Sequence, residues 1–375
     1  MRPIRKFILV IFLLIGLIAI FQLFRLYQQP LGHSLELPTA TRTRPTLTSF
    51  PVEQETILKA STETPQATST PQPLCGGPSR MNILAIGSDA RGDHYLYGLA
   101  DVIRLVRVDF VNARVGILEI PRDLWVDIPG ISDHYGITQG KMNQAYLYGN
   151  KGFGYYDGPG EGPGLLARTL NLNLDIQLDH YLAVNMITFR NIVDAVDGID
   201  VYLPNEISVR SKANPKGFAI PPGQHHIDGE TALWIARIRE IHTFGRADNQ
   251  NIVLCALRKK MLSPAIVPAI PELITTFQRY VQTDLSPEQI NQLACLATQM
   301  NSNDVTFASF PIEIFSNVKK FDPQLKDTTS ILEADNDVLR DYINRFQLGL
   351  WPDPELMINT TPQPDQTDIE FSCED

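Results

Sequence analysis

The sequence predicts an α/β fold that follows an apolar N-terminal segment and a polar linker. Strand-like runs rich in β-branched residues, such as residues 102–108 and 115–120, occur together with stretches of helical spacing. This combination is typical of a sheet covered by helices. With 375 residues, of which 43% are hydrophobic and 20% charged, the chain is long enough for one large domain or two smaller ones.

Residues 7–24, FILVIFLLIGLIAIFQLF, form an almost uninterrupted apolar run. Its length is close to the ~20 residues that span a bilayer as a helix. Arg2, Arg5 and Lys6 precede the run, which favours a cytoplasmic N-terminus and an external remainder. A cleaved signal peptide is the alternative, but no small-x-small cleavage site follows promptly. We therefore expect residues 1–27 to comprise a cytoplasmic tip and a transmembrane signal anchor.

The composition then divides the rest of the chain. Residues 28–80 are rich in Thr, Pro, Ser and Gln, and they contain too little apolar surface to offset the entropy of ordering, so a disordered tether is expected. A folded domain is expected over residues 81–262, followed by a mainly helical C-terminal extension over residues 263–349. Residues 350–375, rich in Pro, Asp and Thr, are expected to be a flexible tail.

One β-hairpin predicts a cluster of charged groups at a sheet edge. If Val108 pairs with Val115, counting back along the two strands places Asp101 opposite Arg122. Asp89 follows the preceding strand and reaches the same edge if that strand is antiparallel to the next one. Carboxylates for Mg²⁺ and guanidinium groups for phosphate, held on a rigid sheet, would form a metal-assisted phosphate site. The alternative is that strand ends are charged because they meet water.

Helices and strands follow one another in the remaining sequence. Strands are expected at residues 180–184, 199–203 and 305–310, and helices at residues 165–172, 186–196, 249–262, 271–281, 286–300 and 332–346. Asp228 opens a further helix that runs into Arg237 and Arg239, which point the same way only in an extended chain. Together with Arg246 they suggest a binding site for an anionic group. A solvated basic patch is the alternative.

Four cysteines permit disulfides if the domain lies outside the cytoplasm. Cys75 and Cys373 lie at the two ends of the folded region, whereas Cys255 and Cys295 lie in apolar helical stretches. We expect the pairs Cys75–Cys373 and Cys255–Cys295, with buried free thiols at Cys255 and Cys295 as the alternative. None of the cysteines has the spacing of a zinc site.

Several functional classes have no support in the sequence. The net charge of −10, without a basic domain or a zinc-finger spacing, argues against a nucleic-acid binder. There is no Gly-x-Ser-x-Gly, no His-Glu-x-x-His and no Walker loop, so hydrolytic nucleophile chemistry is not indicated. His225 and His226 precede a helix, and we expect them to be exposed residues of a Pro-Gly turn rather than a catalytic pair.

The order and spacing of several segments resemble the LytR-CpsA-Psr family, also called the cell-envelope-related transcriptional attenuator domain. The resemblance covers about residues 82–261. The segments are ILAIGSDAR, ADVIRLVRVD, ILEIPRDLWVDIPG, KMNQAYLYG, DHYLAVNMITFRNIVDAVDGIDVYLP, GQHHIDGETALWIARIR and FGR. The resemblance implies an α-β-α sandwich around a central mixed β-sheet, with an apolar groove for a lipid.

The resemblance also implies a membrane-anchored phosphotransferase of the plasma membrane, with its main domain outside the cell. Family members move a glycopolymer phosphate from a polyprenyl-pyrophosphate carrier to a cell-wall acceptor, typically peptidoglycan. By position, Asp89 and Asp101 match the carboxylates that bind Mg²⁺. Lys141 and Gln250 match substrate-binding positions. The arginines that match the pyrophosphate-binding positions are Arg91, Arg122, Arg237, Arg239 and Arg246.

The chain departs from the family pattern at three positions. Leu99 and Asn249 stand where the family has arginine, and Thr243 stands where it has aspartate. Arg104 and Asp248 are nearby candidates to compensate. Two other functions therefore stay open: a non-catalytic protein that binds polyprenyl phosphate or wall polymer, and a polyprenyl pyrophosphatase that uses water as the acceptor.

Overall fold

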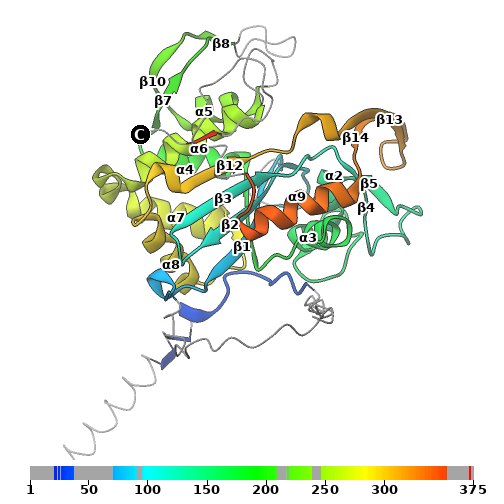
Figure 1. Cartoon of the computed structure of the whole chain (residues 1–375), viewed down its shortest axis with the longest axis horizontal. Helices are drawn as coiled ribbons and strands as arrows, with labels where there is room; N and C mark the ends of the chain where they lie inside the picture. Colours follow the sequence, from blue (N-terminus) through cyan, green and yellow to red (C-terminus); the bar gives the residue numbers. More distant parts are fainter. Residues whose placement is uncertain are drawn as a thin grey trace, which may run out of the picture.

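The computed structural model describes residues 21–22, 24–25, 27–37, 71–90, 95–208, 217, 219–238, 246–352 and 371–372. At its centre lies a seven-stranded β-sheet (Figure 1). In spatial order its strands are β11 (Gln282–Thr283), β6 (His180–Asn185), β1 (Arg80–Ser88), β2 (Ala100–Asp109), β3 (Arg114–Glu119), β12 (Val305–Ala308) and β15 (Phe371–Ser372). The β1–β6 and β3–β12 pairs are parallel and the others antiparallel. The expected mixed α/β fold is confirmed.

Side chains that alternate along the strands give the sheet two covered faces. On one face Leu84 and Ile86 belong to the largest core cluster, together with residues of three helices, α2 (Met142–Gly149), α3 (Glu161–Leu174) and α9 (Asn336–Leu348). The other face, which carries Ala85, is covered by α4 (Met186–Ala195), α5 (Gly229–Arg237), α6 (Arg246–Leu262), α7 (Ile270–Tyr280) and α8 (Pro287–Ala297). Figure 1 shows these two helical layers on either side of the strands.

The register of the central hairpin is the predicted one. Val108 pairs with Val115, and β1 runs antiparallel to β2. The ends of these strands therefore bring Asp89, Asp101 and Arg122 to the same edge of the sheet, as expected from counting residues. The hydrophobic alternation fixes this register, because a slip of one residue would turn every core side chain to the wrong face.

Four small sheets lie outside the central one. They pair β7 (Ile199–Leu203) with β10 (Gly223–Ile227), β8 (Ile207–Ser208) with β9 (Ala219–Ile220), β4 (Trp125–Asp127) with β5 (Gln139–Lys141), and β13 (Ser316–Asp322) with β14 (Asp327–Glu333). The expectation for His225 and His226 is wrong in its local structure, because both lie in β10 rather than in a turn. His226 faces Asp200 of β7, with 2.8 Å between Nδ1 and Oδ1. The β13–β14 hairpin was not expected.

Short 3₁₀ helices complete the described chain, namely η1 (Leu74–Gly76), η2 (Pro264–Ala269), η3 (Ser302–Asp304) and η4 (Ile312–Ile314). Strands β11 and β12 come from the part of the sequence assigned to the C-terminal extension, yet both belong to the central sheet. The extension is thus joined to the preceding domain through backbone hydrogen bonds.

Part of the segment expected to be a tether packs against the domain. Leu35 is buried, with 2% of its surface exposed, and it belongs to the largest core cluster. The Leu31 N–H donates to the Leu285 carbonyl at 3.2 Å. Most of the expected anchor at residues 1–27 lies outside the described residues. Among those that are described, no helix has the length and apolar character needed to cross a membrane.

The expected disulfide pairing is wrong. Cys75 is bonded to Cys295, which joins η1 to α8 across 220 residues of sequence. Cys255 is also disulfide-bonded, so the free-thiol alternative is wrong as well. The fourth cysteine, Cys373, lies outside the described residues. The pairing was unpredictable from spacing because it depends on α8 packing next to the start of β1.

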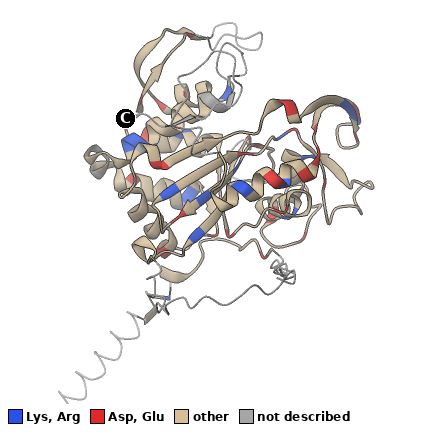
Figure 2. Cartoon of the chain, in the orientation of Figure 1, with Lys and Arg blue, Asp and Glu red and all other residues tan. Residues whose placement is uncertain are grey.

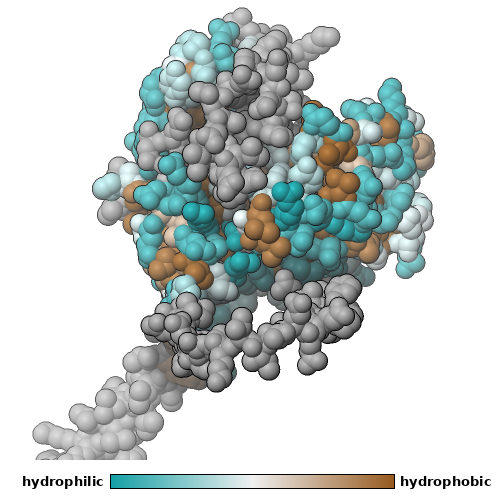
Figure 3. All heavy atoms as spheres, in the orientation of Figure 1, coloured by the Kyte–Doolittle hydropathy of each residue, from teal (hydrophilic) through white to brown (hydrophobic). Residues whose placement is uncertain are grey.

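The described surface mixes charges of both signs, and Figure 2 shows basic and acidic residues dispersed over several elements. Figure 3 shows a largely hydrophilic surface on this face with separate small apolar patches. Single exposed apolar side chains are normal on soluble domains, so only contiguous groups of them call for an explanation.

Candidate functional site

The loop between β1 and β2 is closed at its base by Asp89 and Leu99. The Asp89 N–H donates to the Leu99 carbonyl at 3.0 Å, and the Leu99 N–H donates to Asp89 Oδ1 at 2.6 Å. Gly98, with φ +143°, lets the two arms of the loop approach, because a Cβ there would lie 2.6 Å from Ser88 Oγ. The Asp89 carboxylate is therefore fixed at the end of β1 by backbone contacts.

A series of ion pairs runs from Asp101 to Lys141. Arg122 Nη1 donates to Asp101 Oδ1, and Arg122 Nε contacts Asp123 Oδ2 at 3.3 Å. Lys141 Nζ lies 3.1 Å from Asp123 Oδ1. The side chains of Asp101 and Arg122 are 19% and 21% exposed, so solvent only partly screens their attraction. These partners hold the Arg122 guanidinium in place beside the carboxylate.

A mostly apolar cavity of about 230 Å³ lies between the sheet and the helices α4, α5 and α6. Ala85, Leu182 and Val184 contribute its sheet side, and Phe189 and Val253 belong to its helical side. The remaining lining residues are Ile86, Gly87, Ser88, Asp101, Val102, Arg104, Asn185, Met186, Leu233, Ala236, Arg237, Gln250 and Leu254. The cavity thus combines apolar walls with a few polar groups, which is a common composition of ligand sites.

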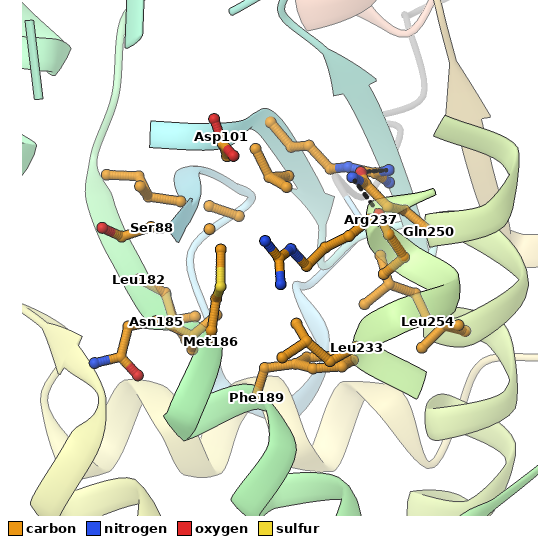
Figure 4. Close-up of a pocket in the computed structure, with 18 residues that line it drawn as sticks. Ser88, Asp101, Leu182, Asn185, Met186, Phe189, Leu233, Arg237, Gln250 and Leu254 are labelled. Carbon is orange, nitrogen blue, oxygen red and sulfur yellow. Dashed lines mark hydrogen bonds between the residues drawn. The ribbon is translucent and has the colours of Figure 1, made fainter. Parts of the chain in front are cut away.

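Figure 4 shows that the Arg237 guanidinium points into the cavity, between Met186 and Leu233. Helix α5 places it there: Asp228 caps this helix by accepting from the Thr231 N–H at 2.8 Å. Hydrogen bonds from Thr231 hold the pKa of the Asp228 carboxyl below its usual range. The Arg237 guanidinium also lies over the Trp234 ring, 5.5 Å from its centroid.

One wall of the cavity carries a buried polar network around Arg104. Arg104 Nη1 donates to Asn251 Oδ1 at 2.7 Å, and Nη2 donates to Gln250 Oε1 at 3.1 Å. Gln250 Nε2 in turn donates to the Ala236 carbonyl at 3.3 Å. Arg104 therefore supplies a positive charge beside Gln250, close to the position where Asn249 replaces the expected arginine. Arg104 and Gln250 are 146 positions apart in the chain, so this contact could not be predicted from the sequence.

Tyr95 is a positioning residue that sequence reasoning missed. Its buried hydroxyl donates to the Tyr280 carbonyl at 2.7 Å and accepts from the Asn185 N–H at 3.0 Å. Burial raises the pKa of Tyr95 from 10.0 to about 12, so the hydroxyl keeps its proton and can act as a donor even at alkaline pH. It ties the β1–β2 loop to the start of α4 and the end of α7.

Two carboxylates of the site, those of Asp89 and Asp101, are of the type that binds Mg²⁺. In the described part of the chain, no group of three or more His, Cys, Asp or Glu side chains is arranged to hold a metal. Asp89 and Asp101 nevertheless offer two hard oxygen ligands at neighbouring strand ends. Mg²⁺ commonly uses one or two carboxylates together with substrate phosphates and waters. The donor set therefore suits an ion that arrives with its substrate.

The structure brings most of the predicted site residues together. Asp89, Asp101, Arg122 and Lys141 lie at or beside the sheet edge, and Asp101, Arg237 and Gln250 line the cavity. Arg246 is the first residue of α6, but its side chain is not among the parts of the chain that the structure describes. Arg91 and Arg239, and with them the proposed pairing of Arg237 with Arg239, lie outside the described residues, as does Thr243.

Comparisons with known proteins agree with this arrangement. The LytR_cpsA_psr family model matches residues 52–342. The regulatory protein MsrR of Staphylococcus aureus (strain COL) is 28% identical over 239 residues, which are 62% of this chain and 65% of MsrR. The polyisoprenyl-teichoic acid–peptidoglycan teichoic acid transferase TagU of Bacillus mycoides (strain KBAB4) is 30% identical over 213 residues, 56% of this chain and 62% of TagU.

The matched region thus spans a little under two thirds of the length of these relatives. The fold is also similar to the crystal structure of B. subtilis TagV, with a TM-score of 0.54 and 24% sequence identity. That likeness covers 73% of this chain and 99% of the TagV chain. A family model that matches most of the chain, and a shared fold, lead to one conclusion: the protein belongs to the LytR_cpsA_psr family.

Proposed function

We propose that the protein transfers a glycopolymer phosphate from a polyprenyl-pyrophosphate carrier to a cell-wall acceptor such as peptidoglycan. The observation that carries this proposal is the combination of an apolar cavity with charged residues at its border. The cavity walls suit a polyprenyl chain, whereas the Arg237 guanidinium suits the pyrophosphate and the Asp101 carboxylate would bind it through a metal ion. The name of TagU, a transferase from a polyisoprenyl carrier to peptidoglycan, supports the same reaction class.

In this reaction an acceptor hydroxyl oxygen forms a bond to the phosphorus next to the glycopolymer. The bond from that phosphorus to the bridging oxygen breaks, and polyprenyl phosphate leaves with the electron pair. The hydroxyl proton passes to a carboxylate of the site or to solvent. Arg122 and Arg237 bind and orient the phosphates and neutralise the charge of their oxygens. A Mg²⁺ ion bound to Asp89 and Asp101 would add further positive charge.

The proposed location is the plasma membrane, with a single N-terminal anchor and the domain on the outer side. The apolar run at residues 7–24 and the preceding basic residues support this topology. The Cys75–Cys295 disulfide is an independent support, because disulfides persist in oxidising, extracytoplasmic compartments. An anchored domain would meet its lipid-linked donor at the membrane surface.

A second candidate is a protein that binds the same lipid or polymer without turnover. The loss of arginine at Leu99 and Asn249 favours it, because both substitutions remove positive charge. Leu99 contributes only its backbone to Asp89 in the structure. The Arg104 guanidinium beside Gln250 argues in the other direction, since it supplies a buried positive charge close to Asn249.

The test uses the purified full chain in detergent with a polyprenyl-pyrophosphate-linked oligosaccharide and Mg²⁺. Polyprenyl phosphate release and attachment of sugar to peptidoglycan are both measured, with Arg122→Ala as the inactive variant. Arg340→Ala, which removes a surface ion pair with Asp337, is the matched control. Transfer that needs Arg122 supports the proposal. Release without an acceptor indicates a pyrophosphatase, binding without release indicates the second candidate, and no binding overturns both.

A further inference from the structure

Four aromatic side chains form a connected series on the surface beside the site. Tyr97 contacts Phe153 with ring centroids 6.1 Å apart, Phe153 contacts Tyr155 at 5.1 Å, and Tyr155 contacts Tyr135 at 6.4 Å. The end members are open to solvent, with Tyr97 57% and Tyr135 84% exposed. Phe153 and Tyr155 between them are half-buried and pack against the core. An aromatic cluster that exposes a ring at each end is a candidate binding surface.

Other aromatic rings pack against the two central members of the series. His134 stacks on Tyr155 with centroids 4.4 Å apart and an angle of 8° between the rings. The buried Tyr148 packs against both Phe153 and Tyr155. A ring that is fixed before binding loses little conformational entropy when a ligand covers it.

The backbone of Tyr135 has an unusual, left-handed conformation. Tyr135 has φ +58°, a conformation that bulky residues rarely adopt. Buried Ile131 and Ile137 anchor the chain on either side, and the Ile137 N–H donates to the His134 carbonyl at 3.1 Å. The turn therefore exposes a large aromatic ring to solvent, on a backbone conformation that tyrosine rarely adopts. Strained exposed positions of this kind are a pointer to function.

The other end of the series leads into the candidate site. Tyr97 is two residues before Leu99, whose N–H binds the Asp89 carboxylate. The loop that carries Phe153 is attached to the same segment, because the Gly152 N–H donates to the Leu96 carbonyl at 3.0 Å. A ligand that covers these rings would thus reach toward the end of β1 where the phosphate site lies.

We propose that the aromatic series Tyr97–Phe153–Tyr155–Tyr135 binds the saccharide of the acceptor, so the inference rests on the proposed function. The C–H face of a pyranose ring stacks on an aromatic ring, while its hydroxyl groups remain in contact with water. The exposed Asp133 and Asp157 are two residues from Tyr135 and Tyr155 in the chain, whereas Lys151, two residues from Phe153, is paired with Glu161. The net charge beside the series is therefore negative and would repel an anionic donor polymer. An uncharged acceptor saccharide fits this surface better than the donor does.

The test measures binding of a soluble tetramer of β-1,4-linked N-acetylglucosamine to the purified full chain by calorimetry. We expect Tyr97→Ala combined with Tyr135→Ala to raise the Kd by about tenfold or more. Tyr202→Ala is the matched control, because Tyr202 is 64% exposed on β7, away from the series. Tyr135→Phe should keep the affinity since it keeps the ring, whereas Tyr135→Leu should lose it.

No binding by the wild type, or equal binding by the double variant, would overturn the proposal. Retained affinity in Tyr135→Leu would also overturn it, because it would indicate general apolar contact of the kind that a peptide or lipid makes. Transfer of sugar from the lipid-linked donor to peptidoglycan, measured in parallel, separates this outcome from failure of the proposed function. A further outcome is that the donor is neither bound nor cleaved while the tyrosine variants bind the saccharide more weakly than the wild type. That result would support the aromatic saccharide site and overturn the transferase proposal.

Discussion

Asp101 at the start of β2 and Arg122 just after β3 form a charged hydrogen bond, although they are 21 positions apart in the chain. The hairpin register alone brings them together, because Val108 opposite Val115 places the two ends of the hairpin side by side. Arg122 is further oriented by Asp123, which also binds Lys141. The arginine is thus fixed before any substrate arrives.

The first prediction concerns this fixed geometry. Arg122→Lys keeps the positive charge but loses the planar fork that contacts Asp101 and Asp123 on different nitrogens. We expect the rate of polyprenyl phosphate release to fall by about 100-fold, as for loss of one preorganised donor. Arg340→Lys on the surface of α9 should leave the rate unchanged. Equal rates for the wild type and Arg122→Lys would show that charge alone suffices.

The second prediction concerns the apolar cavity. Ala85 lines its sheet side, so Ala85→Leu should fill part of the space without disturbing the opposite face of β1. We expect the Kd for a long polyprenyl pyrophosphate to rise about tenfold, because a methylene-rich chain loses apolar contacts there. Geranyl pyrophosphate, whose chain is short, should bind as before. Ala219→Leu, at an exposed position of β9, is the control.

Unchanged affinity of Ala85→Leu for the long chain, with an unaltered unfolding temperature, would place the lipid elsewhere. A loss of affinity for both the long and the short chain would instead indicate damage to the pyrophosphate site.

The third prediction concerns the N-terminal segment that packs on the domain. Leu35→Ala should lower the free energy of unfolding by about 2–5 kcal/mol, because the side chain is buried in the largest core cluster. Leu31→Ala should change it by about 0.5 kcal/mol or less, since Leu31 is 49% exposed. Urea denaturation of the two variants measures the difference. Equal effects would mean that residues 31–37 are not part of the stable fold.

The fourth prediction is a dependence of stability on pH. Burial by itself would raise the pKa of the Asp109 carboxyl, but hydrogen bonds from Asn112 and the charge of Arg107 lower it below its ordinary value of 3.8. A carboxyl with a depressed folded-state pKa stabilises the fold above its unfolded pKa, and this stabilisation is lost as the pH falls through the folded-state pKa. Asp109→Asn removes the charge while keeping one oxygen acceptor.

We expect Asp109→Asn to be less stable than the wild type at pH 7 by about 1.5–3 kcal/mol, the range for hydrogen bonds to a charged group. The difference should shrink as the pH falls below 3.8. Unfolding by urea between pH 7 and pH 2.5 measures it, with Asp133→Asn at an exposed position as the control. A difference that stays constant with pH would contradict the role of the ionised carboxylate.

Some elements and contacts could not be predicted from the sequence, for identifiable physical reasons. The β13–β14 hairpin is rich in Lys, Asp and Thr, so it lacks the apolar alternation that marked β1, β2 and β3. Leu35 is one apolar residue within a polar segment, and its burial depends on a surface made by distant elements. The Arg104–Gln250 contact likewise requires α6 to lie across β2.

The sequence by itself determined the central strands, their register and the meeting of Asp89, Asp101 and Arg122 at one edge, because side-chain alternation and hairpin pairing are local properties. The sequence also contains, in order, the segments that resemble the LytR-CpsA-Psr family. Only the tertiary structure decided that Cys75 bonds Cys295, that Arg104 supports Gln250, and that Tyr97 and Tyr135 belong to one aromatic surface. These contacts join residues of different elements, and the packing of those elements follows from the shape of the whole core rather than from any local pattern.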